Sequence, residues 1–302
     1  MHFIEIQFPN SVAFAKYRRY GRGSVKQILN LAMKKISIIV PVYNVAAFVT
    51  ECMESLRMQT LQDFEAIWVD DRGQDDSIQV IADYMGTHNL QESWRIVQMP
   101  ENGKPAKARN FGLSFATGEY VLFIDADDWI EPTMLETLYS AAKQHNADIS
   151  SAASILDYSD DHHKMWYNPS VGNGVVTAAM RRYLLRHYVS NFTSMLLLRS
   201  WLQENEISFP LSYSGEDSSF VGMCYLMCRC IAQTDELLYH YRIHDDSISH
   251  KKHVYRGTQK RIAFRALIDF ARTKGLLSAY RWTLYWVYFK KAIVSSFLDF
   301  IN

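Results

Sequence analysis

Short apolar runs alternate with segments of helical period from residue 34 to residue 150, and this alternation restricts the fold more than any other feature of the 302-residue chain. The run ISIIVPVY is too uniformly apolar for a strand with one wet face. Buried strands of this kind belong to parallel sheets that helices cover on both faces. The expected strands are 36–43, 64–71, 94–99, 120–125 and 147–154. The sequence therefore predicts an α/β fold with a Rossmann-like, mostly parallel sheet flanked by helices.

Helical segments connect these expected strands. In the first, Phe48, Cys52 and Leu56 recur at every fourth position, and Asn44 is expected to cap the helix. The other expected helices are 75–88, 107–116 and 133–145, the last with Pro132 in its opening turn.

Polar side chains follow the ends of three expected strands. Asn44 comes after the first strand, Asp71 after the second, and the stretch VLFIDADDW ends the fourth strand in acids. These acids are Asp125, Asp127 and Asp128. Parallel strands bring their carboxyl ends to one edge of the sheet, where ligands bind in folds of this class. The sequence therefore predicts a polar site at this edge.

Like charges this close together repel each other, so we expect a positive partner. Carboxylates at a strand end suit a hard divalent cation, Mg²⁺ or Mn²⁺, which leaves its remaining positions to substrate phosphates. The sequence contains no G-x-G-x-x-G or Walker loop, which excludes a dinucleotide or P-loop site. Lys104, Lys107 or Arg109 in GKPAKARN are expected to help hold phosphates, although a solvated helix start explains Lys107 equally well.

Four motifs in order resemble glycosyltransferase family 2, which has the GT-A fold. They are ISIIVPVYN, FEAIWVDDRGQDDS, KARNFGLSFATGEYVLFIDADD and GEDSSF, and the resemblance extends from about Lys34 to His250. The segment MLLLRSWLQENEISFP also resembles the acceptor side of bacterial members. The resemblance implies an inverting transfer of a sugar from a nucleotide-sugar, with UDP expected, to a hydroxyl of a glycan or lipid-linked acceptor.

The resemblance also implies roles in donor binding. Pro41 and Tyr43 would border the nucleotide base, and Asp71 would hydrogen-bond it. Asp125, Asp127 and Asp128 match the metal-binding D-x-D motif, with metal coordination and ribose contact divided between the last two. Arg72-Gly73 stands where family members often have Gly-Ser, a departure that bears on which base is bound.

On the acceptor side, Asp217 matches the catalytic base, with Glu216 beside it. Asp217 would take the proton of the attacking hydroxyl, while the cation stabilises the departing diphosphate. A helix N-cap is the alternative role for Asp217. His244 stands where related enzymes supply a further metal or phosphate contact, with a hydrogen-bonded turn histidine as its alternative.

Charge divides the chain into three parts. Residues 251–302 hold eleven Lys and Arg against two Asp, residues 1–33 are also basic, and the middle is acidic. We expect a catalytic domain over 34–250. Residues 1–33 are expected to be an extension, either disordered or a mis-start, since MKKISIIVPVYN from Met33 resembles a natural beginning. The basic segment 251–302 is rich in aromatics and helical in period, which suits a helix on anionic lipids, a helix packed on the domain, or an oligomer contact.

The whole-chain composition narrows the remaining choices. A net charge of zero argues against nucleic acid as a partner. No apolar run approaches the roughly 18 residues of a membrane span, and the N-terminus does not resemble a signal peptide. Cys224, Cys228 and Cys230 are expected to be small buried hydrophobes with reduced thiols. We therefore expect a cytoplasmic protein, either free or peripheral on the inner face of the plasma membrane.

Two rival functions start from the same acids. An apolar run ending in Asp-x-Asp also resembles haloacid-dehalogenase phosphatases, with Asp125 as nucleophile, but there the motif comes early in the fold and is followed by Gly-Thr, not by Asp128-Trp129. An inactive nucleotide-sugar-binding relative is the other rival, and the intact DADD and GED argue against it.

Overall fold

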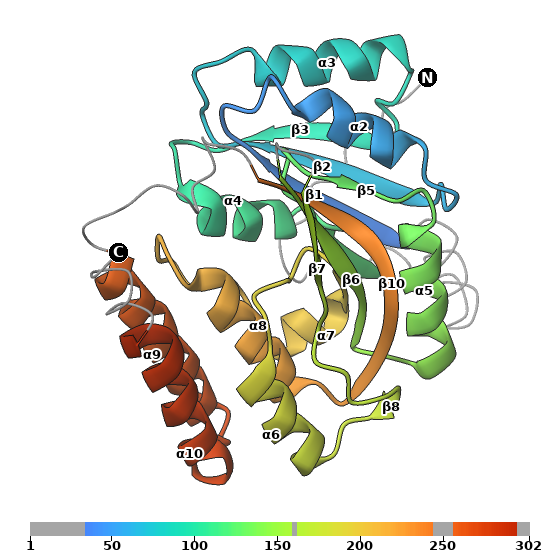
Figure 1. Ribbon diagram of the computed structural model, residues 1–302. Helices are drawn as coiled ribbons and strands as arrows, with labels where there is room; N and C mark the ends of the chain where they lie inside the picture. Colours follow the sequence, from blue (N-terminus) through green and yellow to red (C-terminus); the bar gives the residue numbers. More distant parts are fainter. Residues whose placement is uncertain (1–33, 159–161, 244–255, 295–302) are drawn as a thin grey trace, which may run out of the picture.

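The computed structural model describes residues 34–158, 162–243 and 256–294 (Figure 1). The expected extension over 1–33 and His244 therefore lie outside the described residues.

A mixed sheet forms the centre of the molecule (Figure 1). Its order is β3-β2-β1-β4-β9-β6-β10-β5, with β7 paired to β6 and β8 to β10. The strands are β1 (Ile36–Val42), β2 (Phe64–Asp70), β3 (Trp94–Gln98), β4 (Tyr120–Phe123), β5 (Trp129–Ile130), β6 (Ile149–Tyr158), β7 (His163–Trp166), β8 (Gly174–Val175), β9 (Met195–Leu198) and β10 (Cys230–Ile243). Strands β3, β2, β1 and β4 are parallel, as predicted. Strand β9 is antiparallel to both of its neighbours, β4 and β6.

Helices cover both faces of the sheet, and the sheet separates two hydrophobic cores. They are α2 (Val49–Arg57), α3 (Ser77–Thr87), α4 (Lys104–Leu113), α5 (Met134–His145), α6 (Ala178–His187), α7 (Arg199–Glu204) and α8 (Glu216–Met227). Every residue of β2 is buried, Glu65 and Asp70 included, as expected for a strand that helices cover on both faces. Helix α4 packs unusually close to the sheet, because a Cβ on Gly112 would lie 2.5 Å from Ile39 Cγ2. The backbone of Gly103, just before α4, donates to Asp71 after β2, so the helix begins at the carboxyl edge of the sheet.

Several local expectations are wrong. Asn44 does not cap a helix: it has φ +52° and its Oδ1 accepts a hydrogen bond from the Gln74 backbone, while α2 begins at Val49. Pro132 precedes the N-cap residue Thr133 and so stands outside the helix. The helix expected from residue 107 begins earlier, at Lys104. Of the described cysteines, Cys224 and Cys228 are buried and Cys230 partly so, all with free thiols, as predicted.

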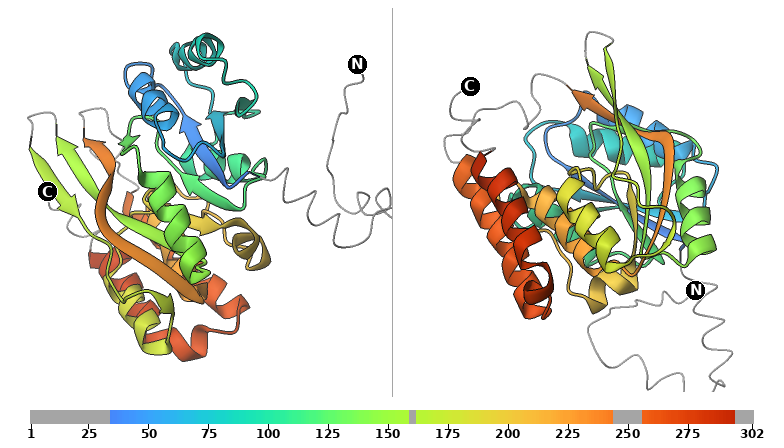
Figure 2. Two further views of the ribbon diagram at one scale, coloured as in Figure 1. Left: turned by 90° about the vertical axis from the view of Figure 1, so that its right-hand side faces the viewer. Right: turned by 60° about the horizontal axis from the view of Figure 1, so that its bottom comes forward.

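The C-terminal helices pack on the rest of the molecule (Figure 2). They are α9 (Arg256–Thr273), α10 (Leu277–Tyr288) and a short π-helical turn, η2 (Phe289–Val294). Leu267 of α9 and Leu284 of α10 are buried in one of the two main cores. A Cβ on Gly222 of α8 would lie 2.7 Å from Leu267 Cδ2, so the two helices are in close contact. Packing on the catalytic part is therefore the arrangement of residues 256–294. No helix among the described residues has the length and apolar character to cross a bilayer.

Candidate active site

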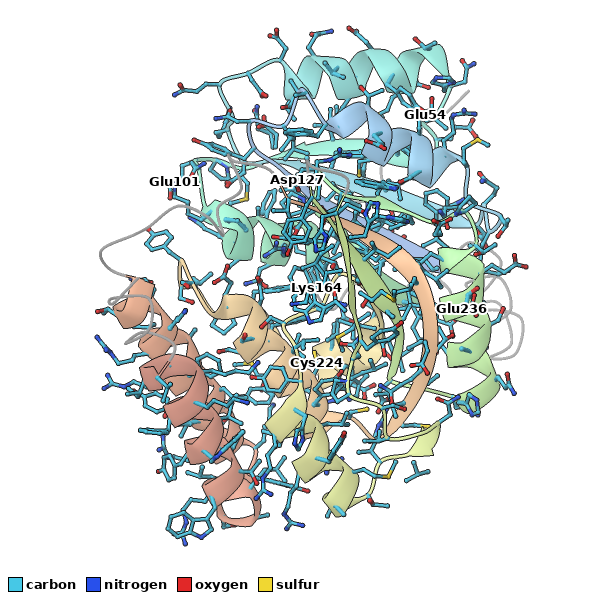
Figure 3. All side chains as sticks on the ribbon, in the orientation of Figure 1. Glu54, Glu101, Asp127, Lys164, Cys224 and Glu236 are labelled. Carbon is cyan, nitrogen blue, oxygen red and sulfur yellow. The ribbon has the colours of Figure 1, made fainter. Side chains whose placement is uncertain are left out.

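The carboxyl ends of β1, β2 and β4 lie side by side. Val42 pairs with Asp70 in the parallel register of β1 and β2, and the Asp71 backbone continues this pairing with a 3.0 Å hydrogen bond to Val42 O. The Ile124 backbone extends β4 in the same way, with a 3.1 Å hydrogen bond to Ile39 O. The structure thus brings Tyr43, Asp71 and the DADD acids to one edge, and Figure 3 labels Asp127 among the side chains there.

Asp71 is buried where β2 meets the start of α4. Its Oδ1 accepts a 2.6 Å hydrogen bond from the Gly103 backbone, and its own carbonyl accepts one from Asn102. Burial raises the pKa of Asp71, while the hydrogen bonds from the Gly103 and Lys104 backbones work against this rise. One of the carboxylate oxygens therefore fixes the loop that leads into α4.

Tyr43 and Lys104 stand at the mouth of this edge. Tyr43 is exposed, Pro41 before it is partly buried in β1, and Lys104 Nζ lies 6.0 Å from the centroid of the Tyr43 ring. Lys107 instead pairs with Glu101 at 3.0 Å, with both side chains largely exposed. Lys107 is thus a solvated residue of the helix start, one of the two interpretations that the sequence allowed.

Arg109 is the buried centre of the site. Its guanidinium donates to Asp125 Oδ1 at 2.7 Å and to Asp217 Oδ1 at 3.2 Å, and its Cζ lies 4.5 Å from the centroid of the Phe192 ring. Burial lowers the pKa of Arg109, but the Asp125 and Asp217 carboxylates outweigh it and raise the pKa above its usual value. Arg109 was expected to contact phosphates. In the structure it lies between the Asp125 carboxylate of the DADD motif and the Asp217 carboxylate of the GED motif.

Asp217 lies in the first turn of α8. The N-cap position is Gly215, at φ +84°, so the N-cap interpretation of Asp217 is wrong. Enclosure of the carboxyl group and the charge of Glu216 raise the pKa of Asp217 to about 8, against the lowering effect of Arg109. The side chain is still 36% exposed, so solvent screening moderates this shift. Glu216 itself is buried.

Asp128 ties the DADD loop to the end of β10. One carboxylate oxygen accepts from the Tyr239 hydroxyl, and the other accepts a 2.8 Å hydrogen bond from the Arg242 backbone. The Tyr239 hydroxyl in turn accepts from the Asp125 backbone at 3.3 Å. Burial, followed by the charges of Asp127 and Asp125, raises the pKa of Asp128 well above its usual range. Asp128 is therefore a buried anchor within the site.

Arg242 lies on the other side of the same loop. Its Nε donates to the Asp127 carbonyl at 2.8 Å, its terminal nitrogen pairs with Glu51, and its Cζ lies 4.5 Å from the centroid of the Trp129 ring. Together with Arg109 it supplies part of the positive charge that the acidic cluster requires. Tyr239 and Arg242 were not identified as site residues from the sequence, although both belong to the segment YHYRIH, which ends at His244.

The donor set fits a cation that takes few protein ligands. Within the described ranges, no three His, Cys, Asp or Glu side chains form a ready metal site. Asp125 is 25% exposed and Asp127 is partly buried, and both offer the hard oxygen donors that Mg²⁺ and Mn²⁺ prefer. Such a cation completes its coordination with substrate phosphates, so one or two carboxylates suffice.

His163 begins β7 and pairs with Asp157 at 2.5 Å. Asp157 also accepts from His240, at 2.8 Å.

Comparison with known proteins identifies the family of the chain. The family model described as glycosyl transferase family 2 matches residues 37–204. The glycosyltransferase GlyG of Streptococcus pneumoniae is 29% identical over 221 residues, which are 70% of this chain and 72% of GlyG. The poly(ribitol-phosphate) beta-N-acetylglucosaminyltransferase TarS of Staphylococcus aureus is 31% identical over 220 residues, 69% of this chain but only 35% of TarS.

Two solved structures share the fold. TarS 1–349 in complex with UDP-GlcNAc superposes with a TM-score of 0.66 at 24% identity, over 78% of this chain and 66% of that one. The mannosyltransferase PcManGT of Pyrobaculum calidifontis, in complex with GDP-Man and Mn²⁺, superposes with a TM-score of 0.58 at 18% identity, over 84% and 72% of the two chains. The predicted fold class is confirmed by these likenesses.

Proposed function

Because the chain belongs to glycosyltransferase family 2, we propose that it moves a sugar from a UDP-sugar to a hydroxyl group of a glycan or lipid-linked saccharide, with inversion at the anomeric carbon. The observation that carries this proposal is the bridge made by Arg109, which holds the DADD motif and the GED motif at one place. Family membership replaces the phosphatase alternative for Asp125.

The donor nucleotide would lie along the ends of β1 and β2. We assign the base to the surface formed by Pro41, Tyr43 and Asp71, and the diphosphate to the side of Lys104. Lys104 supports this because its ammonium group lies beside the exposed Tyr43 ring. Uracil is preferred by analogy with TarS, whereas PcManGT is a GDP-Man binder. The side chain of Arg72 donates to Met99 O at 2.7 Å, which leaves its guanidinium directed into the loop that precedes α4.

The proposed cation ligand is Asp127, with Asp125 beside it. A bound Mn²⁺ or Mg²⁺ would stabilise the charge that develops on the departing diphosphate. Asp128 would hold the loop in place, since both of its oxygens accept hydrogen bonds from β10. The ribose contact that the family resemblance implies would fall to Asp128 or to Asp127. His244 remains a predicted further ligand outside the described residues.

Asp217 is the proposed general base. Its partly exposed carboxylate would accept the proton of the acceptor hydroxyl as the oxygen attacks the anomeric carbon. Arg109 would orient this carboxylate, and Glu216 would raise its proton affinity. A single in-line displacement by the activated oxygen inverts the anomeric configuration.

The acceptor and location belong to the same proposal. GlyG and TarS are bacterial glycosyltransferases, and TarS acts on a poly(ribitol-phosphate). We propose a saccharide acceptor of the bacterial cell envelope and a cytoplasmic enzyme that works at the inner face of the plasma membrane.

A nucleotide-release assay tests the proposal. The full chain is incubated with Mn²⁺ and a panel of UDP-sugars and GDP-sugars, with and without crude membrane saccharides. We expect UDP release from one UDP-sugar that increases with acceptor and falls about a hundredfold or more in Asp217→Asn. If nucleotide-sugars bind to the protein but none is turned over with any acceptor fraction, the chain is the inactive relative and the transferase proposal fails.

A further inference from the structure

Helix α10 presents a row of large aromatic side chains to solvent. Trp282 is 75% exposed, Phe289 just beyond the helix is 57% exposed, and Trp286 lies between them at 43%. The opposite face of α10 is buried through Tyr280, Thr283, Leu284 and Val287. The packing of α10 on the molecule therefore needs none of the exposed rings, and their apolar surface remains uncovered among the described residues.

Basic side chains surround these rings. Arg281 Cζ lies 5.1 Å from the centroid of the Trp282 ring, and Lys290 Nζ lies 5.0 Å from that of Trp286. Arg186 of α6 joins them at a surface hollow of about 530 Å³, which it lines with His187 and the two tryptophans. The sequences of α6, α10 and η2 contain Lys and Arg but no Asp or Glu. The surface is thus complementary to an anionic partner.

We propose that this surface docks on a lipid bilayer that contains anionic lipids. We call it the aromatic–basic face and define it by Arg186, Arg281, Trp282, Trp286, Phe289 and Lys290. Indole rings prefer the boundary between headgroups and acyl chains, and Lys and Arg beside them attract anionic headgroups. A soluble polyanion would be attracted by the charges alone and would give no reason for three exposed rings, so the bilayer is the partner that accounts for both features.

The position of α9 gives docking a consequence for the active site. Helix α9 lies between α10 and the start of α8 (Figure 1). The Tyr213 backbone donates to Gln259 at 3.2 Å, and a Cβ on Gly215 would lie 3.3 Å from Lys260 Cα. A bilayer bound to the aromatic–basic face would therefore hold Asp217 at a fixed height above the lipid headgroups. This inference rests on the proposed membrane location, but its test needs neither donor nor acceptor, so docking and glycosyl transfer can fail separately.

Vesicle sedimentation of the full chain tests the inference. The probes are vesicles of phosphatidylcholine alone and of phosphatidylcholine mixed with phosphatidylglycerol in equal parts. We expect binding only to the mixed vesicles, with a blue shift of tryptophan fluorescence. Arg281→Gln and Lys290→Gln should each lower the partition coefficient about fivefold, since one Lys or Arg near such a surface contributes roughly 1 kcal/mol. The double change Trp282→Ala with Trp286→Ala should lower it by about tenfold or more.

Control variants separate loss of docking from a general effect of mutation. Tyr167, which is 48% exposed and is not part of the aromatic–basic face, is changed to Ala and should leave binding unchanged. Thermal melting checks that each variant is folded. We expect this because the substituted side chains are exposed and do not belong to the core. The inference is overturned if the parent ignores phosphatidylglycerol, if the tryptophan variants bind as the parent does, or if soluble polyphosphate binds as tightly as the vesicles.

Discussion

The buried guanidinium of Arg109 donates a 3.2 Å hydrogen bond to the carboxylate of Asp217, 108 residues away in the sequence. This contact joins α4 to the first turn of α8. It explains how a base proposed for the acceptor side is kept in register with the donor side, where Arg109 also holds Asp125.

Arg109→Gln should cost both stability and activity. Removing one partner of a buried ion pair typically destabilises by about 3–5 kcal/mol, because the remaining charges are uncompensated. Denaturant unfolding and kcat measure the two effects. Arg109→Lys keeps the charge but cannot reach both carboxylates as a planar guanidinium does, so we expect it to restore stability more than kcat. Lys143→Gln, which removes a partly exposed pair with Glu119, should change stability by less than about 1 kcal/mol. Equal losses in Lys143→Gln and Arg109→Gln would contradict this interpretation.

Asp217→Asn should lower kcat by about 10²- to 10⁴-fold while nucleotide binding is retained, which is the range for loss of a general base. In the parent, kcat should rise with pH, because a base works only when deprotonated and the pKa of Asp217 is raised to about 8. The residual rate of Asp217→Asn should lack this rise. A parent profile that is flat from about pH 6 to about pH 9, a range that brackets the raised pKa, would mean that another group is the base.

Tyr239→Phe removes one hydroxyl group from the anchor of the DADD loop. The Asp128 carboxylate would lose a buried donor, at a cost of about 1–3 kcal/mol in unfolding free energy. Nucleotide affinity in the presence of Mn²⁺ should fall with it, because the loop would be less firmly held. Tyr139→Phe removes a comparable bond to Glu119 away from the site and should leave affinity unchanged. If the two variants have the same affinity, Tyr239 is structural only.

Gly222→Ala tests whether the C-terminal helices are part of the folded unit. The new methyl group would meet Leu267 of α9 at 2.7 Å, and overpacking of this kind costs about 1–3 kcal/mol. Gly86→Ala in α3 is the control, because its nearest neighbour would lie 3.9 Å away and Ala favours a helix by roughly 0.5–1 kcal/mol. Unfolding midpoints should therefore move in opposite directions. A neutral Gly222→Ala would mean that α9 yields without loss.

The part of the fold that could be predicted is the part with local signals. The apolar runs of β1, β2 and β4 and the acids that follow them are visible as residue patterns, and the parallel register then brings the acids together. The second half of the sheet could not be derived in this way. Strand β9 has only four residues and pairs antiparallel with both β4 and β6, so its place depends on long-range contacts and not on a period.

The same limit applies to the site. Resemblance selected Asp71, Asp125, Asp127, Asp128 and Asp217 as a group. Their neighbours come from distant segments, and nothing in the spacing of GKPAKARN distinguishes a buried bridge from a phosphate contact. Two basic residues of this helix differ in burial, which the spacing does not reveal: Arg109 is 4% exposed, whereas Lys107 is solvated.

The central claim is that the DADD carboxylates hold a cation against a nucleoside diphosphate, and calorimetric titration of UDP with and without Mn²⁺ tests it most directly. We expect the parent to bind UDP much more tightly with Mn²⁺, and Asp127→Asn to lose this dependence while it stays folded. Metal-independent binding of UDP, equal in the parent and in Asp127→Asn, would contradict the account.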